Sequence, residues 1–70
     1  MKNVEKYKIY LIEQYRVKNN LTGRVVYNLF KNCNIFEYIE TTFEAIHTLD
    51  AAEVLSDIEV EIKKAAKQQD

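Results

Sequence analysis

The sequence predicts an all-α fold, a compact bundle of four helices in a single domain that covers residues 1–70. Three observations lead to this prediction. The chain has one glycine and no proline, whereas loop-rich β folds need these residues at their turns. It has one cysteine, which excludes an internal disulfide, and its 47% hydrophobic content excludes a disordered chain. Finally, apolar residues recur at helical spacing in four segments that are separated by short breaks.

The first two helices are predicted at residues 3–18 and 23–32. The first has an apolar stripe at helical spacing, which consists of Val4, Tyr7, Leu11 and Tyr15. The second should start after Thr22, because a threonine hydroxyl can accept a hydrogen bond from a free amide of the first turn. Its buried side is predicted to contain Val25, Val26, Leu29 and Phe30.

The other two helices are predicted at residues 35–47 and 50–67. Asn34 and Glu37 match a capping box in its asparagine form, in which each side chain satisfies a free backbone amide near the other residue. The fourth helix has a regular apolar stripe, which consists of Ala51, Val54, Leu55, Ile58, Ile62, Ala65 and Ala66. The short connections between all four helices favour a compact bundle.

The formal net charge of −1 conceals an uneven distribution along the chain. Residues 1–35 contain seven lysine or arginine residues and two glutamates, whereas residues 36–61 contain eight acidic residues and no lysine or arginine. We expect the basic first helix to pack beside the acidic later helices with complementary faces. The alternative is that the acidic segment offers a surface to a basic partner protein.

Two of the five tyrosines lie off the predicted apolar stripes. Tyr10 and Tyr27, together with Ile9, would expose apolar surface of the kind that is common at protein interfaces. The alternative is that each tyrosine ring lies flat across a groove with its hydroxyl in water.

The predicted third helix carries two weak signals for other functions. With the helix before it, it has the spacing of a helix-turn-helix motif, but it presents three glutamates and no lysine or arginine, which disfavours DNA binding. Glu44 and His47 have the Glu-x-x-His spacing of di-iron bundles, which need a second such motif and two further glutamates. We therefore favour a solvated acidic face on which His47 caps the end of the helix.

The residues indicate neither an enzyme nor a cofactor. One glycine cannot form a glycine-rich phosphate loop, and Ser56 lacks the motif of a nucleophile elbow. Cys33 is expected to be a half-buried, inert thiol. The apolar run at residues 9–12 is too short for a signal peptide or a spanning helix, so we expect a cytoplasmic protein.

Short motifs follow one another along the chain in a distinctive order. They are residues 10–15 (YLIEQY), 21–23 (LTG), 29–30 (LF), 38–39 (YI), 47–48 (HT) and 57–58 (DI). In order and spacing they resemble a small bacterial family catalogued as domain of unknown function 3791. The sequence departs from the family pattern at Ile46, where leucine is usual, and in lacking a glycine soon after Thr48.

The resemblance implies no enzymatic activity, because the family has none assigned. It implies that the gene for this chain lies beside a gene for an ADP-ribosyltransferase-like protein of suspected toxin type. A member would then be the small partner of such a pair, an antitoxin or accessory subunit.

The function predicted from the sequence is that of a non-enzymatic protein-interaction module without a metal or cofactor. The predicted partner-binding residues are Tyr10, Tyr27, Glu37, Glu40 and Glu44. The alternative is a structural homo-oligomer that has no ligand. A Glu/His metal site and a DNA-binding module are disfavoured.

Overall fold

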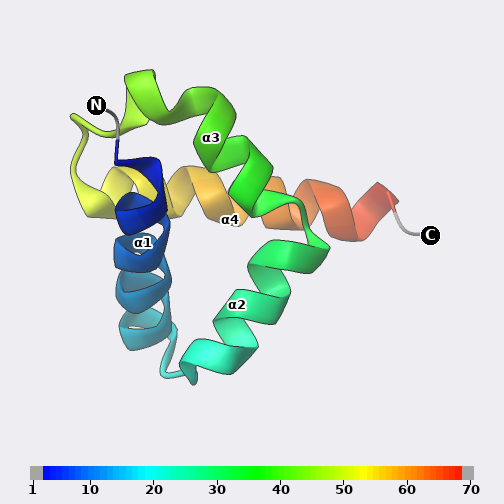
Figure 1. Ribbon diagram of the computed structural model, residues 1–70. Coiled ribbons are helices and arrows are strands. Elements are labelled where there is room, and N and C mark those ends of the chain that lie inside the picture. The colour runs from blue at the N-terminus through cyan, green and yellow to red at the C-terminus, as the bar shows by residue number, and fades with distance from the viewer. Residues whose placement is uncertain (1–2, 69–70) are drawn as a thin grey trace.

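The computed structural model describes residues 3–68, and this part of the chain contains four helices and no strand (Figure 1). The helices are α1 (Val4–Asn19), α2 (Gly23–Asn32), α3 (Ile35–Ile46) and α4 (Ala51–Gln68). The predicted all-α fold with four helices is therefore confirmed. The predicted bounds of α2 are the observed ones, and those of the other helices differ by one residue at one or both ends.

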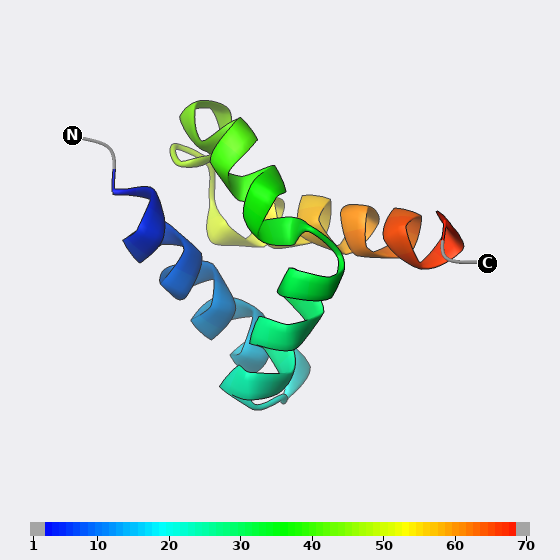
Figure 2. The ribbon, with the colours of Figure 1, turned by 45° about the vertical axis from the view of Figure 1, so that its right-hand side comes forward.

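Helix α1 packs against each of the other three helices, and α3 also packs against α2 and α4. The helices cross one another steeply rather than lying side by side, and α4 runs across the bundle (Figure 1). Figure 2 shows from a second direction that the last turns of α4 extend beyond the other helices. Helices α1 and α3 thus each pack against all three other helices, and α2 and α3 are joined by a tight turn.

All four helices contribute to one hydrophobic core. Its buried residues are Leu11, Tyr15, Val26, Phe30, Ile35, Ile39, Ile46, Val54, Leu55 and Ile58. The predicted burial of Val25 is wrong, since this side chain is 47% exposed. The reason is that α2 packs closely against α1 and α3 but only weakly against α4, which leaves the Val25 side of α2 open to solvent.

The break between α1 and α2 is fixed by two local signals. Asn20 takes the left-handed conformation at φ 55°, and the amide of Leu21 donates to the Arg16 carbonyl at 2.9 Å, which closes α1 with a Schellman turn. The predicted cap of α2 is confirmed, because the Thr22 hydroxyl accepts a hydrogen bond from the Val25 amide at 3.2 Å.

The predicted capping box at Asn34 is wrong. Asn34 has φ 58° and ψ 31°, and its side chain makes no capping hydrogen bond. Only Cys33 and Asn34 separate α2 from α3, so Asn34 must reverse the chain at once in the left-handed region. Asparagine adopts that region more readily than most residues, which explains why it can occupy this position. An N-cap side chain needs extended backbone instead.

One buried polar side chain ties α1 to α4. Tyr15 is almost fully buried, its ring meets the Phe30 ring edge-on at 5.4 Å, and its hydroxyl donates to the Glu59 carboxylate. Burial, followed by the hydrogen bond to Glu59, raises the pKa of the Tyr15 hydroxyl well above its ordinary value. The hydroxyl is therefore a stable donor across the physiological range.

We expect Gly23→Ala and Asn34→Ala to change stability in opposite directions. Gly23 has no positive φ and no atom within 4 Å of an added Cβ, so alanine should raise the free energy of unfolding by about 0.4–1 kcal/mol. Asn34→Ala should lower the free energy of unfolding by about 1 kcal/mol, because the left-handed conformation is less favourable for alanine than for asparagine.

Urea unfolding followed by circular dichroism measures both changes. Asn34→Gly is the control, since glycine adopts positive φ freely and should be at least as stable as the wild type. Equal stabilities of the Ala and Gly variants at position 34 would contradict the assigned turn.

Alkaline pH should destabilise the fold through Tyr15. Because its pKa is raised in the folded state, the stability that it contributes is complete below the unfolded pKa near 10 and is lost as pH rises above that value. The free energy of unfolding, measured in urea at pH 8 and at pH 11, should fall. Tyr15→Phe should show a smaller fall, and an identical fall in both proteins would refute the role of this tyrosine.

Candidate functional site

A groove of about 320 Å³ lies where α1, α2 and α3 meet. Its lining residues are Glu5, Lys8, Ile9 and Ile12 of α1, Tyr27 of α2 and Phe36 of α3. The lining is mainly apolar, and its two charged residues, Glu5 and Lys8, both come from α1. A partner protein could place an apolar side chain in a groove of this composition and place polar groups beside its charged residues.

The walls of the groove keep apolar surface in contact with solvent. The Ile9 side chain is 63% exposed and Tyr27 is 50% exposed. The rings of Tyr27 and Phe36 lie 5.4 Å apart, and Phe36 in turn meets the buried Phe30 ring at 5.8 Å. The aromatic wall is therefore anchored in the core, which makes it a firm surface rather than a loose one.

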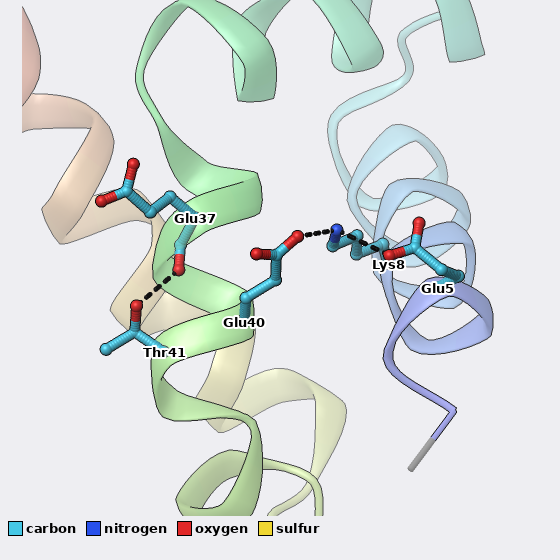
Figure 3. Close-up of polar contacts among 5 residues, drawn as sticks. All are labelled: Glu5, Lys8, Glu37, Glu40 and Thr41. Atoms are coloured by element: carbon cyan, nitrogen blue, oxygen red, sulfur yellow. Dashed lines mark hydrogen bonds and ion pairs between the residues drawn. The ribbon is translucent and has the colours of Figure 1, made fainter. Parts of the chain in front are cut away.

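Lys8 is the positively charged residue of the groove lining. Its side chain is 12% exposed, and its ammonium group donates to Glu5 Oε2 at 3.0 Å and to the Glu40 carboxylate of α3 (Figure 3). The same nitrogen lies 5.9 Å from the centre of the Phe36 ring. The hydrogen bond to Glu40 raises the pKa of Lys8, while partial burial opposes that shift. Lys8 is thus charged and held in place.

The Lys8–Glu40 pair joins the basic α1 to the acidic α3. The prediction that these two helices pack with complementary charges is confirmed at this contact. Glu40 was also predicted to contact a partner, and the structure places it beside the groove with about half of its side chain exposed. Its carboxylate can therefore serve the fold and still face solvent.

The structure brings together only some of the predicted partner-binding residues. Tyr27 lines the groove, and Glu40 adjoins it through Lys8. Tyr10 is exposed but stacks on Tyr7 at a ring distance of 6.1 Å, outside the groove lining. Glu37 and Glu44 are exposed on α3. Figure 3 shows that the Glu37 carboxylate points to the other side of α3 from that of Glu40.

The C-terminal end of α3 is held by polar contacts of its own. His47 Nδ1 donates to the Phe43 carbonyl at 2.7 Å, and its ring stacks on Phe43 at 4.9 Å, so the predicted capping role of His47 is confirmed. The Tyr7 hydroxyl donates to the Ile46 carbonyl at 3.1 Å from α1. Both carbonyls also accept a backbone amide, from His47 and from Leu49, so the two side chains add a second hydrogen bond to each carbonyl at this helix end.

Within residues 3–68, no group of three or more histidine, cysteine or acidic side chains is arranged to hold a metal ion. The Glu44 and His47 pair thus has no further candidate ligand gathered around it in this part of the chain. Nor is any helix of the described residues long and apolar enough to cross a membrane.

A second, more polar groove of about 220 Å³ lies between the α2–α3 turn and α4. Its lining residues are Cys33, Asn34, Ile35, Tyr38, Glu61, Lys64 and Ala65. Cys33 is a free, half-buried thiol, as predicted. Lys64 lies 3.5 Å from Glu61, so these two charges compensate each other. Burial, and then the charges of Asp57 and Glu61, raise the pKa of Tyr38.

Sequence reasoning missed most of the groove lining. Ile9 was recognised as lying off the apolar stripe of the first helix, and that displacement is the signal that marks a second contact face. Ile12 and Phe36 flank predicted stripes and gave no separate signal. Lys8 looks like any surface lysine in the sequence, because its partner Glu40 is identified only by the packing of α1 on α3, and Glu5 is an ordinary neighbour one turn away in α1.

Comparison with family models matches residues 6–65 to a family described as protein of unknown function (DUF3791). The match covers most of the chain. Comparison with curated proteins and with solved structures finds no match.

The Lys8–Glu40 pair should contribute measurably to stability. In a double-mutant cycle of Lys8→Met and Glu40→Gln, we expect a coupling energy of about 0.5–1 kcal/mol in the free energy of unfolding, because Lys8 is mostly shielded from solvent. The coupling should shrink at high salt. The control cycle uses Arg16 and Glu13, which pair within α1 at 3.0 Å. The Arg16 side chain is more exposed than that of Lys8. A larger coupling in the control would contradict this ranking.

Proposed function

The chain belongs to the DUF3791 family of proteins of unknown function, and we propose that it is a non-enzymatic module that binds another protein. The observation that carries this proposal is the groove between α1, α2 and α3. Exposed apolar side chains on a firm aromatic wall are typical of protein interfaces, where a few aromatic and aliphatic anchors supply most of the binding energy.

Ile9 and Tyr27 are the proposed anchors of this interface. Both expose at least half of their surface, and they line the same groove from different helices. A partner that covers them removes apolar surface from water, which favours association by roughly 25 cal/mol per Å² before the costs of association are counted. Tyr27 also carries a hydroxyl that can hydrogen-bond at the edge of such an interface.

The partner that we propose is an ADP-ribosyltransferase-like protein of the toxin type that the family resemblance implies. In this role the chain would act in the bacterial cytoplasm as an antitoxin or accessory subunit. The acidic composition of residues 36–61 supports a basic partner surface, because opposite charge accelerates association and favours one partner over others. Glu37 and Glu44 are the exposed acidic residues of α3 that such a surface would meet beyond the groove.

Self-association through the same groove is the second candidate function. A symmetric dimer would bury Ile9 and Tyr27 of both copies in one interface. Light scattering of the isolated chain distinguishes this candidate from a monomer that awaits a different partner.

The proposed function is tested by co-expression with the product of the neighbouring gene, which the family resemblance implies to be an ADP-ribosyltransferase-like protein. We expect the two proteins to co-purify as a stable complex and the chain to restore growth of the host. Ile9→Ser and Tyr27→Ser should each weaken the complex by about tenfold or more, since truncation of an interface anchor costs at least about 1–2 kcal/mol.

Val17→Ser and Val60→Ser are the matched controls. Val17 lies on α1 like Ile9, and Val60 lies on α4; both are at least half exposed, and neither lines the groove. The control variants should bind like the wild type. Complexes that survive Ile9→Ser and Tyr27→Ser unchanged, or the absence of any complex, would refute the proposal.

A further inference from the structure

One face of α4 points away from the core and changes charge along its length. Glu53, Val60 and Lys67 follow one another on this face at intervals of seven residues, which is about two helical turns. All three residues are exposed, and Val60 is 50% exposed. The buried residues Val54 and Ile58 lie on the opposite side of the helix. The outer face of α4 is therefore acidic near its start, apolar in the middle and basic near its end.

One flank of this outer face repeats the same polarity. Asp57 and Lys64 are exposed and also lie seven residues apart, so they share one side of the helix. Lys64 lies 3.5 Å from Glu61 and keeps 64% of its side chain exposed. Glu53, Asp57 and Lys67 make no ion pair with the described residues. The charges at both ends of the face are therefore available to a partner.

Helix α4 presents this face as a firmly held and accessible element. The buried residues Val54, Leu55 and Ile58 fix the helix in the core, and Glu59 accepts the hydrogen bond from Tyr15 of α1. The last turns of α4, where the basic residues lie, extend beyond the other helices (Figures 1 and 2). A second helix can therefore lie along the basic half without meeting the rest of the fold.

We propose that a second copy of this chain docks antiparallel on the outer face of α4, with Val60 at the two-fold axis. Glu53 lies seven residues before Val60, and Lys67 lies seven residues after it. The two-fold rotation therefore places each Glu53 opposite Lys67 of the partner subunit. On the flank, the rotation brings each Asp57 beside Lys64 of the partner subunit. Both kinds of ion pair occur twice, and the two valines between them lose contact with water.

The charge pattern favours this occupant over others. A parallel copy would set acidic residues against acidic residues and lysines against lysines. A uniformly basic partner would be repelled by Lys67, and a uniformly acidic partner would be repelled by Glu53. An antiparallel copy meets both ends of the face with opposite charge. The face is thus complementary to itself, which is the requirement for a two-fold symmetric interface.

This contact goes beyond the proposed function and does not depend on it. No residue of α4 lines the groove between α1, α2 and α3, so a dimer through α4 leaves the groove of each copy open. The contact also differs from self-association through the groove, which would bury Ile9 and Tyr27.

A charge-reversal series tests the pairing. Glu53→Lys and Lys67→Glu each turn opposite-charge contacts into like-charge contacts, and each should raise the dissociation constant of the dimer by about tenfold or more. The double variant Glu53→Lys/Lys67→Glu restores opposite charges at an unchanged net charge, so it should dimerise like the wild type. Sedimentation equilibrium over a range of protein concentrations measures the constants, and circular dichroism verifies that each variant is folded. High salt should weaken the wild-type dimer.

Lys6→Glu is the matched control for the reversal of a lysine. It makes the same change in net charge as Lys67→Glu, at an exposed residue of α1 outside the proposed contact. We expect this variant to dimerise like the wild type. A loss of dimer equal to that of Lys67→Glu would assign the effect to general charge and would contradict the proposed pairing.

A disulfide cross-link tests the register. In a Cys33→Ser background, which removes the native thiol, Val60→Cys places one cysteine of each copy at the two-fold axis. Helix axes about 8–10 Å apart bring facing Cα atoms within the roughly 7 Å that a disulfide spans. On addition of an oxidant, this variant should form a covalent dimer at least about tenfold faster than Val17→Cys, an exposed site on α1. Equal rates would refute the assigned axis.

The remaining outcomes separate this inference from the proposed function. A wild-type monomer at every concentration refutes the α4 dimer, as does a double variant that stays as weak as the single ones. If Ile9→Ser and Tyr27→Ser dissociate the dimer and the α4 variants do not, the groove is the contact instead. Val60→Ser should weaken the dimer and leave the complex with the product of the neighbouring gene intact.

Discussion

Helix α1 makes contacts with three neighbouring helices at once, since it packs against α2, α3 and α4. It does so with different faces. Leu11 and Tyr15 enter the core, the Tyr15 hydroxyl reaches Glu59 on α4, and Tyr7 and Lys8 reach α3. A chain of 70 residues buries a small fraction of its surface compared with larger domains, so it depends on such multiple use of one helix.

The groove follows from this central position and from the turn at Asn34. The left-handed residue reverses the chain between α2 and α3 without a loop, so both helices remain beside α1. Tyr27 and Phe36 then form one wall, and Ile9 and Ile12 of α1 form the other. Glu5 and Lys8 of α1 complete the lining, whereas Leu11 and Tyr15 of the same helix enter the core.

Lys8 connects stability and binding in a single side chain. Its bond to Glu40 joins α1 to α3, and its bond to Glu5 lies within α1 (Figure 3). Lys8 also lines the groove, so the contact that joins the two helices holds one of the groove residues in place. A surface that is held in place before binding needs little reorganisation, which favours affinity.

The four helices, most of the core and the Thr22 cap can be predicted from the sequence, because helical periodicity and capping are local properties of the chain. The sequence identified Tyr27 and Glu40 as candidate contact residues but gave no reason to place them near each other. Three features appear only once the helices are packed: Asn34 turns the chain instead of capping a helix, Val25 stays exposed, and Lys8 lies between Glu5 and Glu40. These features depend on how closely helices approach one another, and that distance is set by the packing of side chains that lie far apart in the sequence.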